Sequence, residues 1–209
     1  MFAIAGGGDG RRLEGAIEAA CPGAIGVISI GLGGALAAGL NPGDWVVGHA
    51  VPDGATRFPT DPDWTSRLMQ RLPGARLGAI VGSDVMVPDA AAKATLHAAA
   101  GALVVDMESH IAARLAARHG LPFAAARTVS DAADRALPKA AQAGMKPDGG
   151  MDVWGVIRAL ARDPRELPDL IRTALEAETA FRALLRGRQL LGPTLGRGAD
   201  LGELLVDVG

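Results

Sequence analysis

The chain has 209 residues, of which 49% are hydrophobic and 21% are charged, so it can bury a core and suits one α/β domain better than two small ones. The net charge of −2 and the few aromatic residues argue against a nucleic-acid partner. Cys21 is the single cysteine, which excludes a disulfide or a cysteine metal site within the chain. Because no apolar run reaches about 18 residues and no export signal is visible, we expect a cytoplasmic protein.

The first half of the chain alternates short apolar runs with helical patterns. Hydrophobic periodicity predicts strands at 2–5, 25–30, 45–51 and 77–82, helices at 11–20, 64–72 and 89–100, and a loop at 52–62. The glycine-rich segments 6–10 and 31–34 are predicted to be flexible turns.

The next segment has the pattern of a βαβ unit. It consists of strand ALVV (102–105), a helix that runs to Gly120, and strand FAAARTV (123–129). From residue 152 the pattern is helical, with a break at Pro164 and a long amphipathic helix over 166–191. The sequence therefore predicts a single α/β domain over 1–191, with a mixed, largely parallel twisted sheet flanked by helices, a helical part at 152–191 and a Gly-rich tail at 192–209.

Acidic residues follow the two strands of the βαβ unit. Asp106 and Glu108 come after the first strand, and Asp131 comes after the second. A right-handed βαβ connection would place these strands side by side with their carboxyl ends at one edge, where α/β proteins bind ligands. Each acid alone also has a structural explanation, since Glu108 and Asp131 could serve helix starts. Their coincidence at one edge favours a functional site.

Other motifs give weaker signals. Neither GGGDGRR nor GLGGALAAG matches a dinucleotide-binding or P-loop pattern, although the backbone N–H groups of Gly7 and Gly33 could still meet an anion or a sugar hydroxyl. The histidines show no metal-ligand spacing, so we expect no metal; they are His49, His97, His110 and His119.

Four segments carry a resemblance to a known family. VVDMES (104–109) and ARTVSDAAD (126–134) resemble the signature of the nucleoside phosphorylase and nucleosidase superfamily. VISIGLGGALAAGLNPGDWVVG (27–48) and VGSDVMVPD (81–89) resemble further segments of that family in the same order. The similarity covers roughly residues 2–135.

The resemblance implies roles for individual residues. Glu108 would accept hydrogen bonds from the ribose hydroxyls, and Met107 would pack on the ribose. Met86 and Val87 would border the purine. Asp131, with Ser130 beside it in the substrate site, would be the general acid for the departing base. No cofactor is implied, and inorganic phosphate remains open as a co-substrate.

Within this superfamily, the AGGGD start, the Gly31–Gly34 segment and the Arg- and Leu-rich region at 147–174 resemble the hopanoid-associated phosphorylase branch. This resemblance implies release of adenine from adenosylhopane, a lipid-linked nucleoside, at the inner face of the membrane. One alternative is a methylthioadenosine or S-adenosylhomocysteine nucleosidase, or a purine nucleoside phosphorylase, acting on small nucleosides. Another is a non-catalytic nucleoside-binding protein. By family analogy we expect a homodimer.

Two departures from the family pattern are visible. By comparison with the family, we expect its first strand to be missing before the AGGGD segment, and Leu32 stands where a serine is common in the glycine turn. The long helix at 166–191 carries several arginines beside its apolar face. This face could contact an anionic bilayer, or it could pack on the sheet or on a second subunit.

Overall fold

The computed structural model describes residues 3–6, 9–144 and 153–197. Its helices are α1 (Gly10–Ala20), α2 (Pro62–Arg71), α3 (Ala90–Ala100), α4 (Ser109–Arg118), α5 (Lys139–Gly144), α6 (Val153–Arg162) and α7 (Leu167–Leu191), with a short 3₁₀ turn η1 (Pro164–Glu166). Its strands are β1 (Val27–Ala35), β2 (Trp45–Asp53), β3 (Thr56–Pro59), β4 (Arg76–Gly82), β5 (Ala102–Asp106) and β6 (Phe123–Asp131).

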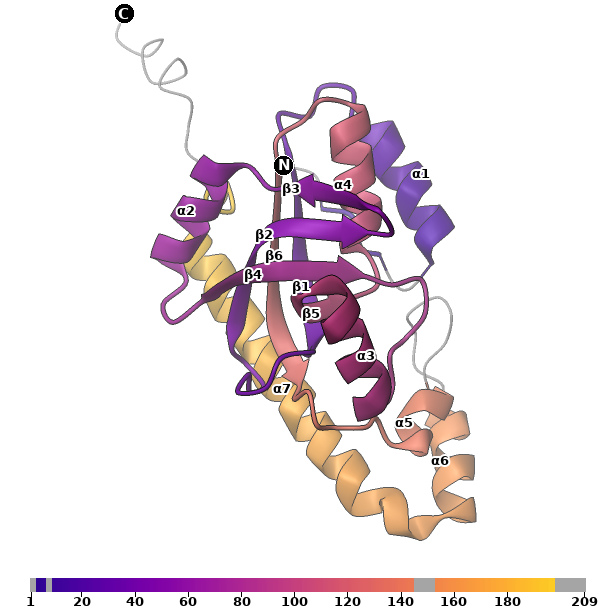
Figure 1. Ribbon diagram of the computed structural model, residues 1–209. Helices are drawn as coiled ribbons and strands as arrows, with labels where there is room; N and C mark the ends of the chain where they lie inside the picture. Colours follow the sequence, from indigo (N-terminus) through magenta and orange to yellow (C-terminus); the bar gives the residue numbers. More distant parts are fainter. Residues whose placement is uncertain (1–2, 7–8, 145–152, 198–209) are drawn as a thin grey trace, which may run out of the picture.

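The strands form one mixed sheet that closes on itself (Figure 1). The order is β3-β2-β4-β5-β1-β6, and β2 also pairs with β6, so β2, β4, β5, β1 and β6 form a ring. The β1–β6, β2–β4 and β4–β5 pairings are parallel, whereas the β1–β5, β2–β3 and β2–β6 pairings are antiparallel. The predicted α/β class with a mixed sheet and flanking helices is confirmed.

Strand β1 lies between β5 and β6. The prediction that the two strands of the 102–129 unit are direct neighbours is therefore wrong: β5 pairs with β4 and β1, and β6 pairs with β1 and β2. Because β5 runs antiparallel to β1 and β6 runs parallel to it, β5 and β6 also run in opposite directions, and the predicted parallel βαβ unit is wrong as well.

The glycine-rich segment 31–34 belongs to β1 and is not the predicted turn. A Cβ at Gly33 would overlap the side chain of Val104 and lie 2.8 Å from the carbonyl oxygen of Val105. The register of β1 against β6 shifts between Gly33 and Gly34, and the pairing of β1 with β5 begins at Gly34. The glycines are needed here because two backbones approach closely at an irregularity in the strand.

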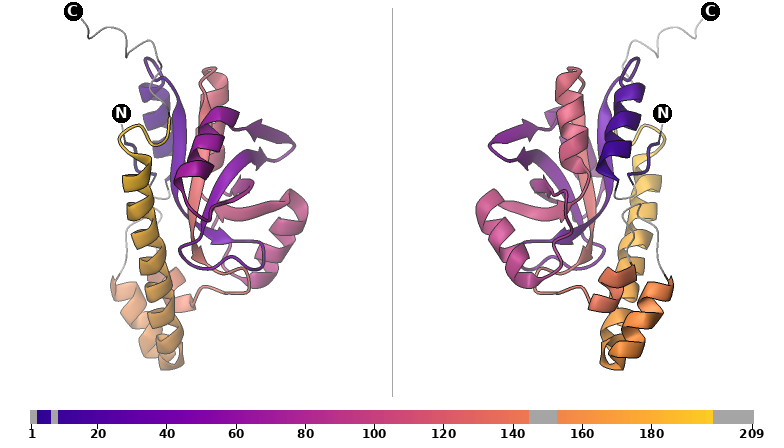
Figure 2. Two further views of the ribbon diagram at one scale, coloured as in Figure 1. Left: turned by 90° about the vertical axis from the view of Figure 1, so that its left-hand side faces the viewer. Right: turned by 90° about the vertical axis from the view of Figure 1, so that its right-hand side faces the viewer.

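Helices cover the sheet on several sides (Figure 2). α1 and α4 pack on a core cluster that includes Leu13, Ile111 and Leu115. α2 and α7 enclose a second cluster around Trp45 and Trp64. Strand β6 is buried from Phe123 to Val129, which explains its mostly apolar sequence; Arg127 and Thr128 are the buried polar exceptions.

Several local predictions can be compared with the structure. Residues 3–5 form no strand, and β3 occupies part of the segment predicted as a loop. The predicted cap at Asp89 is confirmed, since its Oδ1 accepts a hydrogen bond of 2.8 Å from the backbone N–H of Ala92. Gly120 follows α4 with a φ of +65°, as expected for a glycine that ends a helix.

The lone cysteine lies within the core. Cys21 is buried beside the end of α1. Burial, followed by the charge of Glu18, raises the pKa of its thiol. A thiol in this setting is a structural part of the core rather than a nucleophile.

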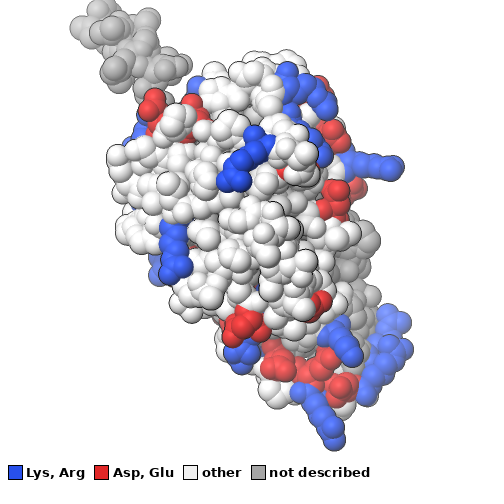
Figure 3. Space-filling view, viewed as in Figure 1, with Lys and Arg blue, Asp and Glu red and all other residues white. Residues whose placement is uncertain are grey.

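The long helix α7 has two apolar faces. Ala180, Ala183, Gly187 and Leu191 are buried against the sheet and α2. The opposite face leaves five large side chains about half exposed: Leu167, Ile171, Leu175, Phe181 and Leu185. The first turns of α7 project beyond the sheet with α5 and α6 (Figures 1 and 2), and charged side chains of both signs gather at this end (Figure 3). None of the helices in the described ranges is both long and apolar enough to cross a membrane.

Part of the predicted Gly-rich tail folds back on the body of the protein. Leu195 is buried, and its carbonyl oxygen accepts a hydrogen bond of 2.9 Å from the indole N–H of Trp64. Arg67 donates to the carbonyl oxygen of Gly196. These contacts attach the residues just after α7 to α2.

Candidate active site

The carboxyl ends of β5 and β6 meet on either side of one glycine. Gly34 in β1 pairs with Val105 of β5 and with Asp131 of β6. A Cβ at Gly34 would lie 3.3 Å from Oδ2 of Asp131. The predicted meeting of the two strand ends therefore occurs, although β1 lies between them.

Asp106 caps the helix that follows β5. Its Oδ1 accepts hydrogen bonds of 2.7 Å from the backbone N–H groups of Glu108 and Ser109. These are two of the N–H groups that the start of α4 would otherwise leave unpaired. The capping role that the sequence offered for Glu108 thus belongs to Asp106.

Glu108 is half-buried at the start of α4, and its side chain makes no capping hydrogen bond. Within the described ranges its carboxylate has no hydrogen-bond or ion-pair partner. A Cβ at Gly6 would overlap this carboxylate, so the backbone of Gly6 lies directly against it. An acceptor held at a partly covered surface, with its lone pairs unused, suits a ligand hydroxyl.

A buried ion pair lies behind these residues. Nε of Arg127 lies 2.7 Å from Oδ2 of Asp106, and the two side chains are 1% and 3% exposed. The guanidinium also donates to the carbonyl oxygen of Ser29 at 2.7 Å and to its hydroxyl at 2.6 Å. Arg127 therefore connects β6 to β1 and, through Asp106, to the start of α4. Arg127 was not among the predicted site residues, although a single charged residue inside the apolar strand FAAARTV was a visible signal.

Asp131 ends β6, and its two oxygens have different partners. Oδ1 accepts a hydrogen bond of 2.6 Å from the hydroxyl of Ser130. Oδ2 forms an ion pair with the ammonium group of Lys93 from α3. Because residues 132–138 contain no helix, Asp131 has no helix to cap. Lys93 was not among the predicted site residues either, although a lone lysine in an alanine-rich helix was a visible signal.

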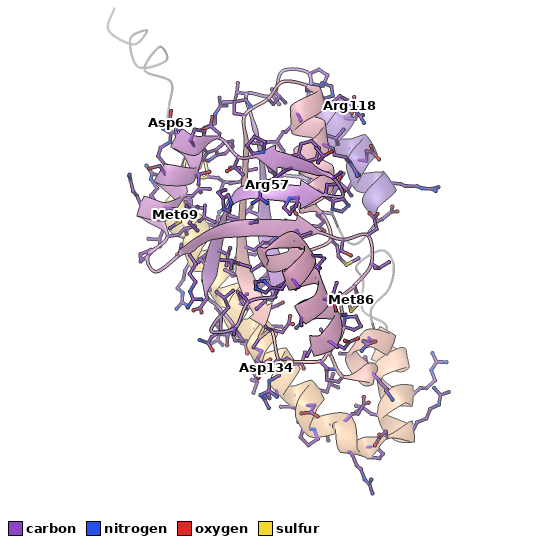
Figure 4. The ribbon with its side chains drawn as sticks, in the orientation of Figure 1. Arg57, Asp63, Met69, Met86, Arg118 and Asp134 are labelled. Carbon is purple, nitrogen blue, oxygen red and sulfur yellow. The ribbon has the colours of Figure 1, made fainter. Side chains whose placement is uncertain are left out.

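The remaining predicted site residues are placed as follows. Met107 is half-buried next to Glu108, and Met86 is half-buried in the segment between β4 and α3 (Figure 4). Val87 packs against a small core cluster around Leu36 and Val105. Gly33 is buried within β1, so its role in binding stays a prediction, and Gly7 lies outside the described residues.

A pocket of about 210 Å³ opens beside Asp131. The segment after β6 contributes Asp134, Arg135 and Leu137, and the first turns of α7 contribute Asp169, Arg172 and Glu176. Asp134 lies where this segment leaves the sheet (Figure 4). Across the ranges that the structure describes, no group of three or more His, Cys, Asp or Glu side chains is arranged to hold a metal ion.

The sequence profile of the Phosphorylase superfamily matches residues 14–149, which is more than half of the chain. The chain belongs to the phosphorylase superfamily. Its matched region contains Asp106, Glu108, Arg127 and Asp131. Among curated proteins, no sequence matches this phosphorylase-superfamily chain.

Solved structures share the fold at low sequence identity. S-adenosylhomocysteine nucleosidase from Streptococcus pyogenes, in complex with 5-methylthiotubericidin, is 20% identical with a TM-score of 0.55, over 81% of this chain and 76% of that one. The 5′-methylthioadenosine/S-adenosylhomocysteine nucleosidase from S. pneumoniae, with a transition-state inhibitor, is 19% identical with a TM-score of 0.55, over 86% and 79%.

Futalosine hydrolase from Helicobacter pylori is 18% identical with a TM-score of 0.54, over 59% of this chain and 65% of that one. The phosphorylase-superfamily chain thus spans about two thirds of the length of the futalosine hydrolases that it matches. At these identities the structural likeness shows the fold.

Proposed function

We propose that the protein cleaves the N-glycosidic bond of a purine nucleoside, and that its natural substrate is adenosylhopane. The observation that carries this proposal is the carboxylate of Glu108, which has no partner among the described residues and follows β5 where the ends of β5 and β6 flank Gly34 of β1. Family membership and the nucleosidases among the solved structures support the reaction class.

Glu108 would hold the ribose. Its carboxylate would accept hydrogen bonds from the 2′ and 3′ hydroxyls, and Met107 would pack against the sugar. Hydrogen bonds to a charged acceptor are stronger than those between neutral groups. As the bond between C1′ and the purine N9 breaks, the sugar gains positive charge, which a nearby carboxylate stabilises.

Asp131 would serve the purine, with Ser130 beside it and Met86 and Val87 bordering the base. The electron pair of the broken bond passes to the purine, and Asp131 donates a proton to N7 or holds a proton already there. Water or inorganic phosphate then attacks C1′. An assay with and without phosphate distinguishes water from phosphate as the acceptor.

The exposed apolar face of α7 favours a lipid-linked substrate. Arg182 and Arg186 lie beside the five large apolar side chains of this face. Such a helix surface would let the enzyme approach a membrane that contains the lipid nucleoside. A second copy of the chain is the competing partner for the same face, in keeping with the homodimer expected by analogy.

A second candidate function is cleavage of small nucleosides. The solved nucleosidases act on, or are named for, 5′-methylthioadenosine and S-adenosylhomocysteine, which favours this alternative. The same acids would serve it, and only the group at the 5′ carbon would differ.

The deciding experiment measures adenine release from adenosylhopane, methylthioadenosine and adenosine, each with and without phosphate. Release from the lipid nucleoside alone supports the proposal, and dependence on phosphate identifies the acceptor. Release from the small nucleosides alone favours the second candidate. Nucleoside binding without release of base from any of the three would overturn both and indicate a non-catalytic binding protein.

A further inference from the structure

Lys93 is a fully buried cation next to the proposed base-binding acid. Its side chain is 1% exposed, and it projects from the first turns of α3, just after the segment that holds Met86 and Val87. The ammonium donates to Oδ2 of Asp131, to the carbonyl oxygen of Ala132 at 2.9 Å and to that of Arg135 at 3.0 Å. An ammonium group has three N–H donors, so all of them are used.

All three acceptors lie on one short segment of the chain, residues 131–135. Lys93 therefore determines both the path of the backbone after β6 and the orientation of the Asp131 carboxylate. Ser130 holds the other oxygen of that carboxylate. A carboxylate offers about four lone-pair positions, so two bonds fix its orientation and leave acceptor capacity for a ligand.

The charge of Lys93 bears on the reaction as well as on the geometry. A purine that leaves with the electron pair of its glycosidic bond becomes more negative. A buried, uncompensated carboxylate would repel it, and this repulsion is poorly screened away from water. A fixed ammonium beside the carboxylate cancels that repulsion without any rearrangement during the reaction.

We infer that Lys93 is a positioning residue for Asp131, which fixes the carboxylate and balances its charge while the purine departs. This inference rests on the proposed cleavage of a purine nucleoside. The competing explanation is that the hydrogen bonds of Lys93 only anchor the segment 131–135 to α3. In that case its removal would lower stability, and any loss of rate would not depend on the carboxylate of Asp131.

A double-mutant cycle separates the two explanations. The variants are Lys93→Met, Asp131→Asn and the combination, with Lys139→Met as the control because Lys139 is an exposed lysine outside the site. We expect Lys93→Met to lower kcat by about 10²-fold with a much smaller change in KM. In the Asp131→Asn background, the same change should alter kcat by less than about threefold, because Lys93 acts through the carboxylate.

The combined variant removes both charges and leaves no unpaired buried ion, so it can be compared directly with Asp131→Asn. If Lys93→Met alone does not fold, Lys93→Gln, which removes the charge but keeps hydrogen-bond donors, replaces it in both backgrounds. Circular dichroism at the assay temperature confirms folding of each variant. If Lys93→Met lowers kcat as much in the Asp131→Asn background as in the parent chain, in folded protein, the inference is overturned. If the unmodified chain releases no base, both the proposed function and the inference are wrong. If the chain releases base but Lys93→Met has the same effect in both backgrounds, the inference alone is wrong.

Discussion

The backbone of Gly6 lies directly against the carboxylate of Glu108, and no side chain larger than hydrogen fits between them. This contact brings Gly6 to the start of α4, about 100 residues later in the chain. It explains the position of a glycine for which the sequence offered only a flexible turn.

We expect Gly6→Ala to displace the Glu108 side chain and lower kcat/KM by up to about 10²-fold, since small misplacements of binding groups carry large kinetic costs. The free energy of unfolding should change little, because a flexible side chain can rotate away. Gly15→Ala is the matched control: nothing lies within 4 Å of a Cβ there. It should leave the kinetics unchanged and stabilise α1 by roughly 1 kcal/mol. Normal kinetics for Gly6→Ala would contradict a role for this contact.

Asp131→Asn should lower kcat by about 10²- to 10⁴-fold, because the amide can neither donate the same proton nor balance Lys93. Asp134→Asn, three residues later at the exposed side of the same pocket, is the control and should retain full activity. Steady-state release of adenine measures both. Equal rates for Asp131→Asn and the parent chain would remove Asp131 from the mechanism.

Glu108→Gln should raise KM and lower kcat, because a neutral amide is a weaker acceptor for the ribose hydroxyls. A loss of about 1.5–3 kcal/mol corresponds to a fall in kcat/KM of roughly 10- to 150-fold. A 2′-deoxynucleoside provides the control: the penalty for the missing hydroxyl, seen with the parent chain, should largely vanish in Glu108→Gln. If the loss in kcat/KM from Glu108→Gln and the loss from the missing 2′ hydroxyl simply add, Glu108 does not contact that hydroxyl.

Arg127→Met should lower the free energy of unfolding by about 3–5 kcal/mol, because it leaves the carboxylate of Asp106 buried without its cation. Adding Asp106→Asn should recover part of this loss, since asparagine keeps an acceptor for the start of α4. Arg114→Met breaks an ion pair of 3.0 Å whose side chains are 39% and 28% exposed, and it should cost under about 1 kcal/mol. Urea unfolding curves measure the free energy of unfolding of all three variants. Similar losses for Arg127→Met and Arg114→Met would show that burial does not strengthen the Arg127–Asp106 pair.

If α7 contacts a membrane, the protein should co-sediment with anionic liposomes. The variant Leu175→Glu/Phe181→Glu should bind the liposomes at least about tenfold more weakly, because it places charge on the apolar face. Leu77→Glu is the control, since Leu77 is 53% exposed and belongs to β4 instead of α7. Absence of sedimentation even with adenosylhopane in the liposomes would remove the membrane part of the proposal. Size-exclusion chromatography of the same variants tests whether a second copy covers this face.

Local patterns in the sequence were enough to predict the helices α2 and α4, the strands β4, β5 and β6, and the placement of acids at the ends of β5 and β6. These features depend on periodicity, caps and glycines within a few residues of each other, so they are visible in a single sequence. The short signatures around Glu108 and Asp131 also pointed to the family that the profile match establishes.

The tertiary structure alone decided how these pieces meet. The insertion of β1 between β5 and β6, the closure of the sheet by β2, and the strand at 31–34 all depend on pairing between distant segments, which no local pattern specifies. The same holds for the partners of the acids. Asp106 pairs with Arg127 and Asp131 pairs with Lys93, because desolvation makes buried charges pair where the fold brings opposite charges together. The half-buried Glu108 has no partner among the described residues.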